Sequence, residues 1–320
     1  MKLIFVLASL ALHFVISPMA VAQSQYPNKP IRIIVPYPPG GATDVIARQI
    51  SVKLGPLLGQ TVVVENKAGA SGNIGFDFVA KANPDGYTLL MGTANMTIGP
   101  AFSKLPFNVL TDFAPISTVV SSQNLLVIRP SLPVKNLKEL LDFAKSNPGK
   151  LNFGSSGIGT PLMTIELMKA MADVKIMNVP YKGDAPAIND LLGGQIDMYA
   201  STVTGLIEHV KGGKLRAMGV TSKKRASSLP DVPTIEEAGV PGYELVSWYG
   251  ILAPGGTAPE IVKKLNENLV KVIAMPEIQQ QLIAGGSDPW STSPEQFSEL
   301  IRKDVAKFDR LVKEYKIKVD

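Results

Sequence analysis

The sequence predicts an α/β protein with mainly parallel β-sheet, because short apolar runs alternate with amphipathic segments along most of its length. In the segment 44–54, Ile46, Ile50 and Leu54 recur at the spacing of one helix face. A second amphipathic segment, 137–145, ends just before a Pro-Gly pair, as helices often do. The runs with the length and composition of strands are 31–35, 61–64, 87–91, 125–128, 150–153 and 175–179.

The C-terminal part is expected to be helical. Thr257 and Glu260 have the spacing of a capping box, and so do Ser293 and Gln296, with Pro294 between them at the first helical position. Apolar residues follow each box at helical spacing, but no strand-like run accompanies them. These helices must therefore pack on an earlier sheet, which predicts that the chain returns to its first lobe.

Residues 1–22 have the pattern of a signal peptide. Lys2 precedes an apolar stretch, 3–15, and Ala20-Val21-Ala22 provides a cleavage pattern before Gln23. The alternative is an uncleaved membrane anchor, for which the stretch is short. We expect an exported protein, periplasmic in a cell with two membranes.

Composition argues against several classes of function. The formal net charge is +5 without a dense Lys/Arg block, which does not favour nucleic-acid binding. There is no cysteine, and the histidines are His13, within the leader, and His209. A Ser-His-Asp triad or a zinc site would depend on His209. That residue stands near the expected end of a helix, where histidine commonly complements the helix dipole. We therefore expect no catalytic residue, no metal and no cofactor.

Three glycine-rich loops each follow an expected strand and precede an expected helix. They are "VPYPPGGATD" (35–44), "ENKAGASGNIG" (65–75) and "FGSSGIGTP" (153–161). A helix start offers free N–H groups to an anion, and glycine lets the backbone approach a ligand. None of the loops fits a P-loop, a dinucleotide fingerprint or a nucleophile elbow. A single such loop is often only a tight turn, but three together predict a binding cleft.

These loops belong to longer stretches that resemble one family, the substrate-binding proteins of tripartite tricarboxylate transporters, often called Bug proteins. The resemblance covers nearly the whole chain after the leader. The stretches that carry it include "YPNKPIRIIVPYPPGGATDVIAR" (26–48), "VVVENKAGASGNIG" (62–75), "VPYKGDAPAINDLLGGQIDM" (179–198) and "WYGILAPGGTAPEIVKKL" (248–265).

The resemblance implies a two-lobed periplasmic binding protein, type II-like, with two crossover segments and a ligand cleft between the lobes. Lobe one would comprise 23–123 plus 252–320, and lobe two 124–251. The ligand would be a small organic acid: a mono-, di- or tricarboxylate, an amino acid or an aromatic acid. A monomer that works with membrane permease subunits is expected.

The expected ligand contacts lie at the ends of strands. Gly40, Gly41 and Thr43 are expected to donate to a ligand carboxylate, whereas Asp44 stabilises the loop. Trp248 and Tyr249 are expected to pack the hinge, and Lys182 to face water. The full predicted set is Pro39, Gly40, Gly41, Thr43, Ser71, Thr93, Asn95, Ser155, Ser156, Gly157, Thr160, Tyr181, Gly183, Ser201 and Thr202.

Two departures from the family pattern affect the expected contacts. Gly99 stands where relatives often have Asn, and the stretch after Thr160 lacks a histidine near Met163. The functional alternatives are an orphan carboxylate receptor used in sensing and an exported hydrolase built on Ser156 and His209.

Overall fold

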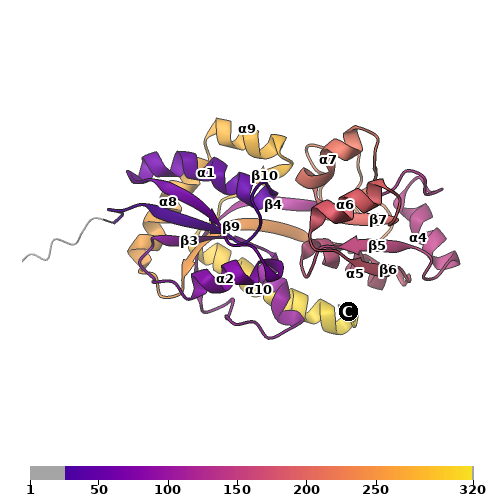
Figure 1. Cartoon of the computed structure of the whole chain (residues 1–320), viewed down its shortest axis with the longest axis horizontal. Coiled ribbons are helices and arrows are strands. Elements are labelled where there is room, and N and C mark those ends of the chain that lie inside the picture. Colours follow the sequence, from indigo (N-terminus) through magenta and orange to yellow (C-terminus); the bar gives the residue numbers. More distant parts are fainter. Residues whose placement is uncertain (1–25, 319–320) are drawn as a thin grey trace, which may run out of the picture.

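Two groups of strands share one long strand, and helices cover both faces of each group (Figure 1). The computed structural model describes residues 26–318, so the predicted leader lies outside the described residues. The strands are β1 (Ile31–Val35), β2 (Val62–Asn66), β3 (Thr88–Thr93), β4 (Phe113–Ile128), β5 (Asn152–Ser155), β6 (Met177–Pro180), β7 (Met198–Thr202), β8 (Arg216–Val220), β9 (Val246–Pro254) and β10 (Ser287–Pro289). The helices are α1 (Ala42–Leu58), α2 (Asn73–Ala80), α3 (Asn95–Ile98), α4 (Leu137–Ser146), α5 (Thr160–Ala172), α6 (Asp184–Leu192), α7 (Val203–Lys211), α8 (Pro259–Ile273), α9 (Pro276–Ala284) and α10 (Pro294–Glu314).

The strand order is β2-β1-β3-β9-β4-β7-β5-β6, with β8 and β10 also paired to β4. The ladders among β1, β2 and β3 and among β5, β6 and β7 are parallel. The long strands β4 and β9 are antiparallel to their neighbours, so the expectation of a mainly parallel sheet missed them. Residues 113–123 of β4 pair with β9, and residues 124–128 pair with β7 and β8. One strand thus links the two groups.

The predicted α/β class and two-lobed plan are confirmed. Buried apolar runs explain the strands: every residue of β3 is buried, as is typical of strands covered on both faces. The lobe boundaries at 123/124 and 251/252 stay a prediction. Within residues 26–318, no helix has both the length and the hydropathy needed to cross a membrane.

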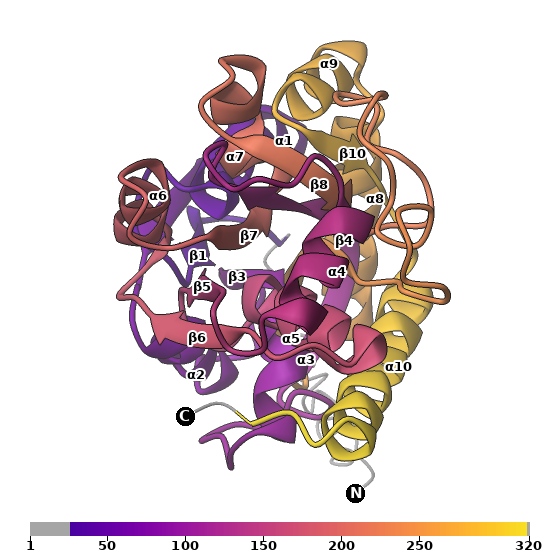
Figure 2. The ribbon, with the colours of Figure 1, turned by 90° about the vertical axis from the view of Figure 1, so that its right-hand side faces the viewer.

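The C-terminal helices do not all remain with the first group of strands. Phe297 and Ile301 of α10 pack with β3 and β9, but Phe308 packs in the core cluster around Leu126 and Ile128. Figure 2 shows α10 running along one side of the molecule past α4 and α5. The expectation that this helix returns to lobe one therefore holds only for its first half.

Helix starts follow the sequence signals in one case and depart from them in another. Ser293 and Gln296 form the predicted capping box. The box predicted at Thr257 is wrong, because the Thr257 hydroxyl donates to the carbonyl of Pro254 and α8 begins at Pro259 without a side-chain cap. A short strand, β10, also lies in the region expected to be purely helical.

Candidate functional site

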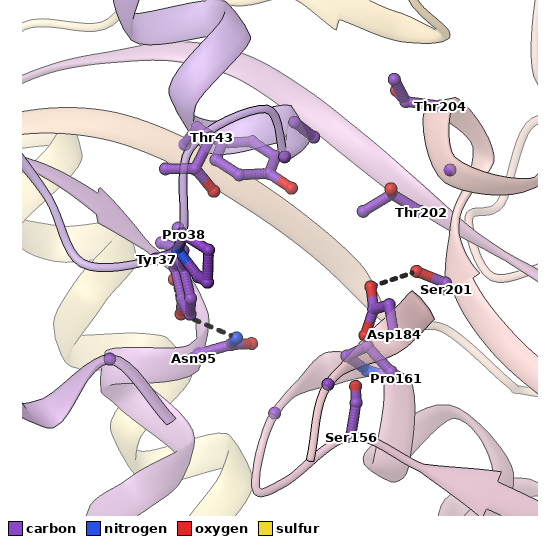
Figure 3. A pocket seen from close by; sticks show the side chains of 18 of the residues that line it. Tyr37, Pro38, Thr43, Asn95, Ser156, Pro161, Asp184, Ser201, Thr202 and Thr204 are labelled. Atoms are coloured by element: carbon purple, nitrogen blue, oxygen red, sulfur yellow. Dashed lines mark hydrogen bonds between the residues drawn. The ribbon is translucent and has the colours of Figure 1, made fainter. Parts of the chain in front are cut away.

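A cavity of about 1020 Å³ lies between the two groups of strands, where the glycine-rich loops converge (Figure 3). Its walls come from the segments that follow β1, β2 and β3 on one side and β5, β6 and β7 on the other. Ligands in α/β proteins bind at this end of the strands, because loops from several strands gather there.

The β1–α1 loop presents backbone donors to the cavity. Gly40 adopts φ +84°, a left-handed conformation that favours glycine, and Gly41 leads into α1 without a side-chain cap. The first N–H groups of a helix have no partner within that helix. In the described part of the chain, the N–H groups of Gly41, Ala42 and Thr43 donate to no other group. They are therefore free to bind an anion.

Asp44 fixes this loop from behind, as expected. Its carboxylate accepts the N–H of Gly40 at 3.0 Å, the Asn66 amide at 2.9 Å and two guanidinium bonds from Arg48. Burial by itself would raise the pKa of the Asp44 carboxyl, but the hydrogen bonds from Arg48, Gly40 and Asn66 outweigh it. They lower that pKa to about 2. Asp44 is only 3% exposed and its charge is neutralised, so it does not act on a ligand.

Tyr37, Thr93 and Asn95 form a network that reaches across the cavity. The Tyr37 hydroxyl lies 3.0 Å from the Thr93 hydroxyl and accepts the Asn95 amide at 3.0 Å. The Asn95 carbonyl oxygen accepts the N–H of Thr160 at 2.9 Å. Burial raises the pKa of Tyr37, so the phenol stays neutral. Asn95 thus joins the loop after β3 to the start of α5.

The loops of the two sides approach closely at two glycines, Gly157 and Gly159. A Cβ at Gly157, where φ is +98°, would lie 2.6 Å from the Ser71 hydroxyl oxygen. A Cβ at Gly159 would lie 2.8 Å from the Asn95 carbonyl oxygen. Both distances are below van der Waals contact, so a side chain at either position would require Ser71 or Asn95 to move.

On the far wall, Asp184 begins α6 and accepts two hydroxyl groups from β7. Tyr199 donates to Oδ1 at 2.7 Å, and Ser201 donates to Oδ2 at 3.0 Å. The Ser156 hydroxyl lies 3.1 Å from the Tyr199 hydroxyl. Burial, and next the Asp184 charge, raise the pKa of Tyr199, so this phenol remains a donor.

Most residues predicted for the site line this cavity, and two do not. Ser155 is buried in β5, and its carbonyl accepts the N–H of Tyr181. The Tyr181 hydroxyl donates to Asp190 at 2.7 Å, outside the lining. Ligand contact by any of these residues stays a prediction. The predicted residues that line the cavity are Pro39, Gly40, Gly41, Thr43, Ser71, Thr93, Asn95, Ser156, Gly157, Thr160, Gly183, Ser201 and Thr202.

Several residues of the lining were not predicted from the sequence. Tyr37 lies in the first glycine-rich loop, and Asp184 lies in one of the stretches that resemble the family. Their polar side chains could have indicated a place in the cavity wall. Tyr249 is buried and lines the cavity, whereas Trp248 packs on Phe297 and donates to Asp304. Their expected role in packing a hinge stays a prediction. No pattern in the sequence pointed to the contribution of the α9–β10 region. Its lining residues are Gln281, Leu282, Gly285 and Ser287.

The site shows no arrangement for metal binding or nucleophile activation. Among residues 26–318, no group of three or more His, Asp or Glu side chains has metal-binding geometry. His209 lies in the last turn of α7 and is not part of the cavity wall. The Ser156 hydroxyl lies beside the phenol of Tyr199, not beside an imidazole that could act as a general base.

Similar curated sequences extend over nearly the whole chain. A protein from the tcbD-tcbE intergenic region of Pseudomonas sp. (strain P51) is 38% identical over 316 residues, which cover 98% of this chain and 94% of that protein. Protein BugT of Bordetella pertussis is 35% identical over 298 residues, which cover 92% of this chain and 91% of BugT.

Solved structures agree with the fold and with a binding role. The periplasmic binding protein BugD is 36% identical with a TM-score of 0.83, covering 92% of this chain and 99% of BugD. A Rhodopseudomonas palustris protein solved with adipate is 34% identical with a TM-score of 0.85, covering 91% and 99%. MatC from the same organism, with bound malate, is 29% identical with a TM-score of 0.81, covering 90% and 100%.

The family assignment follows from the match of residues 46–317 to the family described as "Tripartite tricarboxylate transporter family receptor". The match begins within α1, after β1 and its loop, and includes the strands β2 to β10, the cavity loops of α5 and α6, and the C-terminal helices α8 to α10. The chain therefore belongs to the receptor family of tripartite tricarboxylate transporters.

Proposed function

We propose that this protein is an exported, periplasmic solute-binding protein that clamps a small organic carboxylate between two lobes and delivers it to a membrane transporter. It performs no catalysis. Lobe one comprises 23–123 plus 252–320, although the second half of α10 packs on lobe two; lobe two comprises 124–251, and residues 1–22 are the signal peptide. The family supports the receptor role, and the adipate and malate bound by two similar proteins support the class of ligand.

The observation that carries this proposal is the row of unpartnered N–H groups at the start of α1. A helix N-terminus carries roughly half a positive charge, so a carboxylate gains both hydrogen bonds and dipole attraction there. The Thr43 hydroxyl adjoins these donors, and the cavity separates them from Thr160 at the start of α5. A ligand in this position contacts both lobes at once.

Closure is supported by the contacts that already join the two sides. The bond from Thr160 to Asn95 and the approach of Ser71 to Gly157 cross the cavity. A ligand that adds contacts on both walls stabilises this arrangement over an open one, because it binds the closed form better.

The proposal is tested by calorimetry and thermal unfolding of ligand-stripped protein against mono-, di- and tricarboxylates and amino acids. A ligand at 100 times its Kd adds about 2.7 kcal/mol to the stability of the folded state. Thr43→Val is expected to weaken the bound acid by about 1 kcal/mol, since one hydroxyl donor is lost. The matched control is Thr61→Val, an exposed threonine outside the cavity. Absence of binding to every acid would contradict the proposal.

A hydrolase would require His209 to activate a serine, so His209→Ala separates the two functions. We expect the free energy of unfolding to change by no more than about 0.5 kcal/mol, as for most surface substitutions, and acid binding to be unchanged. Ester or amide turnover by the wild type, abolished in His209→Ala, would overturn the non-catalytic assignment.

A further inference from the structure

One carboxylate of the protein faces the cavity from the wall opposite α1. Asp184 follows Gly183, whose φ of +124° places the chain in a conformation suited to glycine. Tyr199 and Ser201 donate to its two oxygens, and both donors come from β7. Figure 3 shows the Asp184 side chain directed into the cavity beside Ser201, across from Tyr37 and Thr43. Two hydroxyl groups therefore fix the position of this carboxylate.

Asp184 forms no salt bridge with any described residue, although Lys182 lies two positions before it in the same cavity lining. The charged side chains in the cavity lining are Asp184 and Lys182, and no salt bridge between described residues includes Asp184. Its negative charge reaches the opposite wall: burial is the main cause that raises the pKa of Tyr37 and Tyr249, and the Asp184 charge raises both further. The cavity thus has N–H donors at one end, at the start of α1, and the Asp184 carboxylate at the other, with Lys182 as the remaining charged side chain of the lining.

A solute that enters this cavity must suit both ends. A second carboxylate near Asp184 would be repelled by the like charge, and an alkyl end would leave the carboxylate without a counter-charge. A protonated amino group would pair with Asp184 and donate to the lone pairs that Tyr199 and Ser201 leave free.

From this polarity we infer that the solute is an amino-carboxylate, a zwitterion whose carboxylate binds at the start of α1 and whose ammonium group binds Asp184. The inference rests on the proposed function, because it places the carboxylate where that function requires it. It narrows the class of organic acids to those that carry a cationic nitrogen.

Calorimetry with matched acids tests the inference on the wild-type protein. Alanine, propionate and methylmalonate carry an ammonium group, a hydrogen or a second carboxylate at one position of the same skeleton. 4-Aminobutyrate, butyrate and glutarate do the same at the end of a longer chain. We expect the amino acid of at least one set to bind about tenfold or more tightly than its two partners, as for a hydrogen-bonded charge pair.

The variant Asp184→Asn then tests the residue. It keeps the side-chain shape and removes the charge, so the preference for the amino acid should fall by about tenfold while the dicarboxylate of the set gains affinity. Asp190→Asn is the matched control, since Asp190 lies on the same helix and outside the cavity lining. It should leave all six affinities unchanged.

The remaining outcomes of these binding experiments contradict either this inference alone or the proposed function as well. Tighter binding of propionate, butyrate or the dicarboxylates to wild type would overturn this inference and leave the proposed carboxylate receptor intact. An amino-acid preference that survives in Asp184→Asn would also overturn it. Failure of every acid in the wider panel to bind would overturn the proposed function, and this inference with it.

Discussion

Asp44 and Asp184 both stand in the first turn of a helix that lines the cavity, and they differ in every partner. Asp44 is buried beneath the β1–α1 loop, where Arg48, Asn66 and the Gly40 N–H surround its carboxylate. Asp184 is exposed to the cavity and, among the described residues, accepts only the hydroxyl groups of Tyr199 and Ser201. The first is a structural part of the proposed anion site, and the second has no cationic partner in a salt bridge between described residues.

The difference shows that the position of a carboxylate at a helix start does not determine its role. An acidic residue there is favoured by the helix dipole in either case. The role depends on the partners of the carboxylate: a carboxylate paired with a cation of the protein stabilises the protein, whereas an unpaired one can bind a ligand. For Asp44 these partners include Arg48 one turn later; α6 provides no such cation to Asp184.

The largest effect is expected from removing the buried carboxylate. Asp44→Ala deprives Arg48, Asn66 and the Gly40 N–H of a charged acceptor, and we expect the free energy of unfolding to fall by about 2 kcal/mol. Asp184→Ala should cost no more than about 1 kcal/mol, because Ser156 still lies beside the Tyr199 hydroxyl. Urea denaturation measures both values. Equal losses in the two variants would contradict the distinction between the residues.

The pH dependence of stability should distinguish Asp44 in the same way. Its pKa is lowered from 3.8 to about 2 in the folded state, so its ionised form contributes stability that is present above about pH 4 and lost as the pH falls toward 2. The stability difference between wild type and Asp44→Asn should therefore shrink over that window. Urea denaturation at several pH values checks this, and a constant difference would show that the Asp44 charge is not involved.

A smaller effect is expected from the glycine that Asp44 holds. A Cβ at Gly40 meets no atom within 4 Å, but the residue has φ +84°, so Gly40→Ala should cost about 1 kcal/mol of stability through backbone strain. It should also weaken acid binding, because the loop presents the N–H groups. Gly149→Ala is the control: φ is +76°, there is open space for its Cβ, and it lies outside the cavity. If the two variants bound acids with similar affinity, the β1–α1 loop would not be part of the anion site.

Local patterns predicted strands that overlap β1 to β6, although only the last four residues of β4 were expected, and β7 to β10 were not predicted. The strand 31–35 and the helix after it follow from a buried apolar run and a helical stripe, and Ser293 and Gln296 cap α10 as expected. The antiparallel strands β4 and β9 were harder to predict, since their direction depends on long-range pairing that a single segment does not encode. The packing of the second half of α10 was hard to predict for the same reason, because its contacts are with strands that are distant in the sequence.

The site was predictable where glycine-rich loops follow strands, and less so elsewhere. Gly40 and Gly157 have positive φ, which favours glycine, so the residue type itself indicates the backbone shape of these loops. Asp184 needs Tyr199 and Ser201 on a neighbouring strand to fix its direction, and the α9–β10 wall reaches the cavity only through tertiary packing. Side-chain direction and long-range contact were therefore the parts that the sequence alone did not specify.

The most direct test of the proposed ligand position is a crystal structure of the protein with the tightest-binding acid of the panel. We expect the carboxylate within about 3 Å of the N–H groups of Gly41, Ala42 and Thr43, with a ligand nitrogen at hydrogen-bond distance from Asp184. A carboxylate bound elsewhere in the cavity, or a ligand without any group at Asp184, would contradict it.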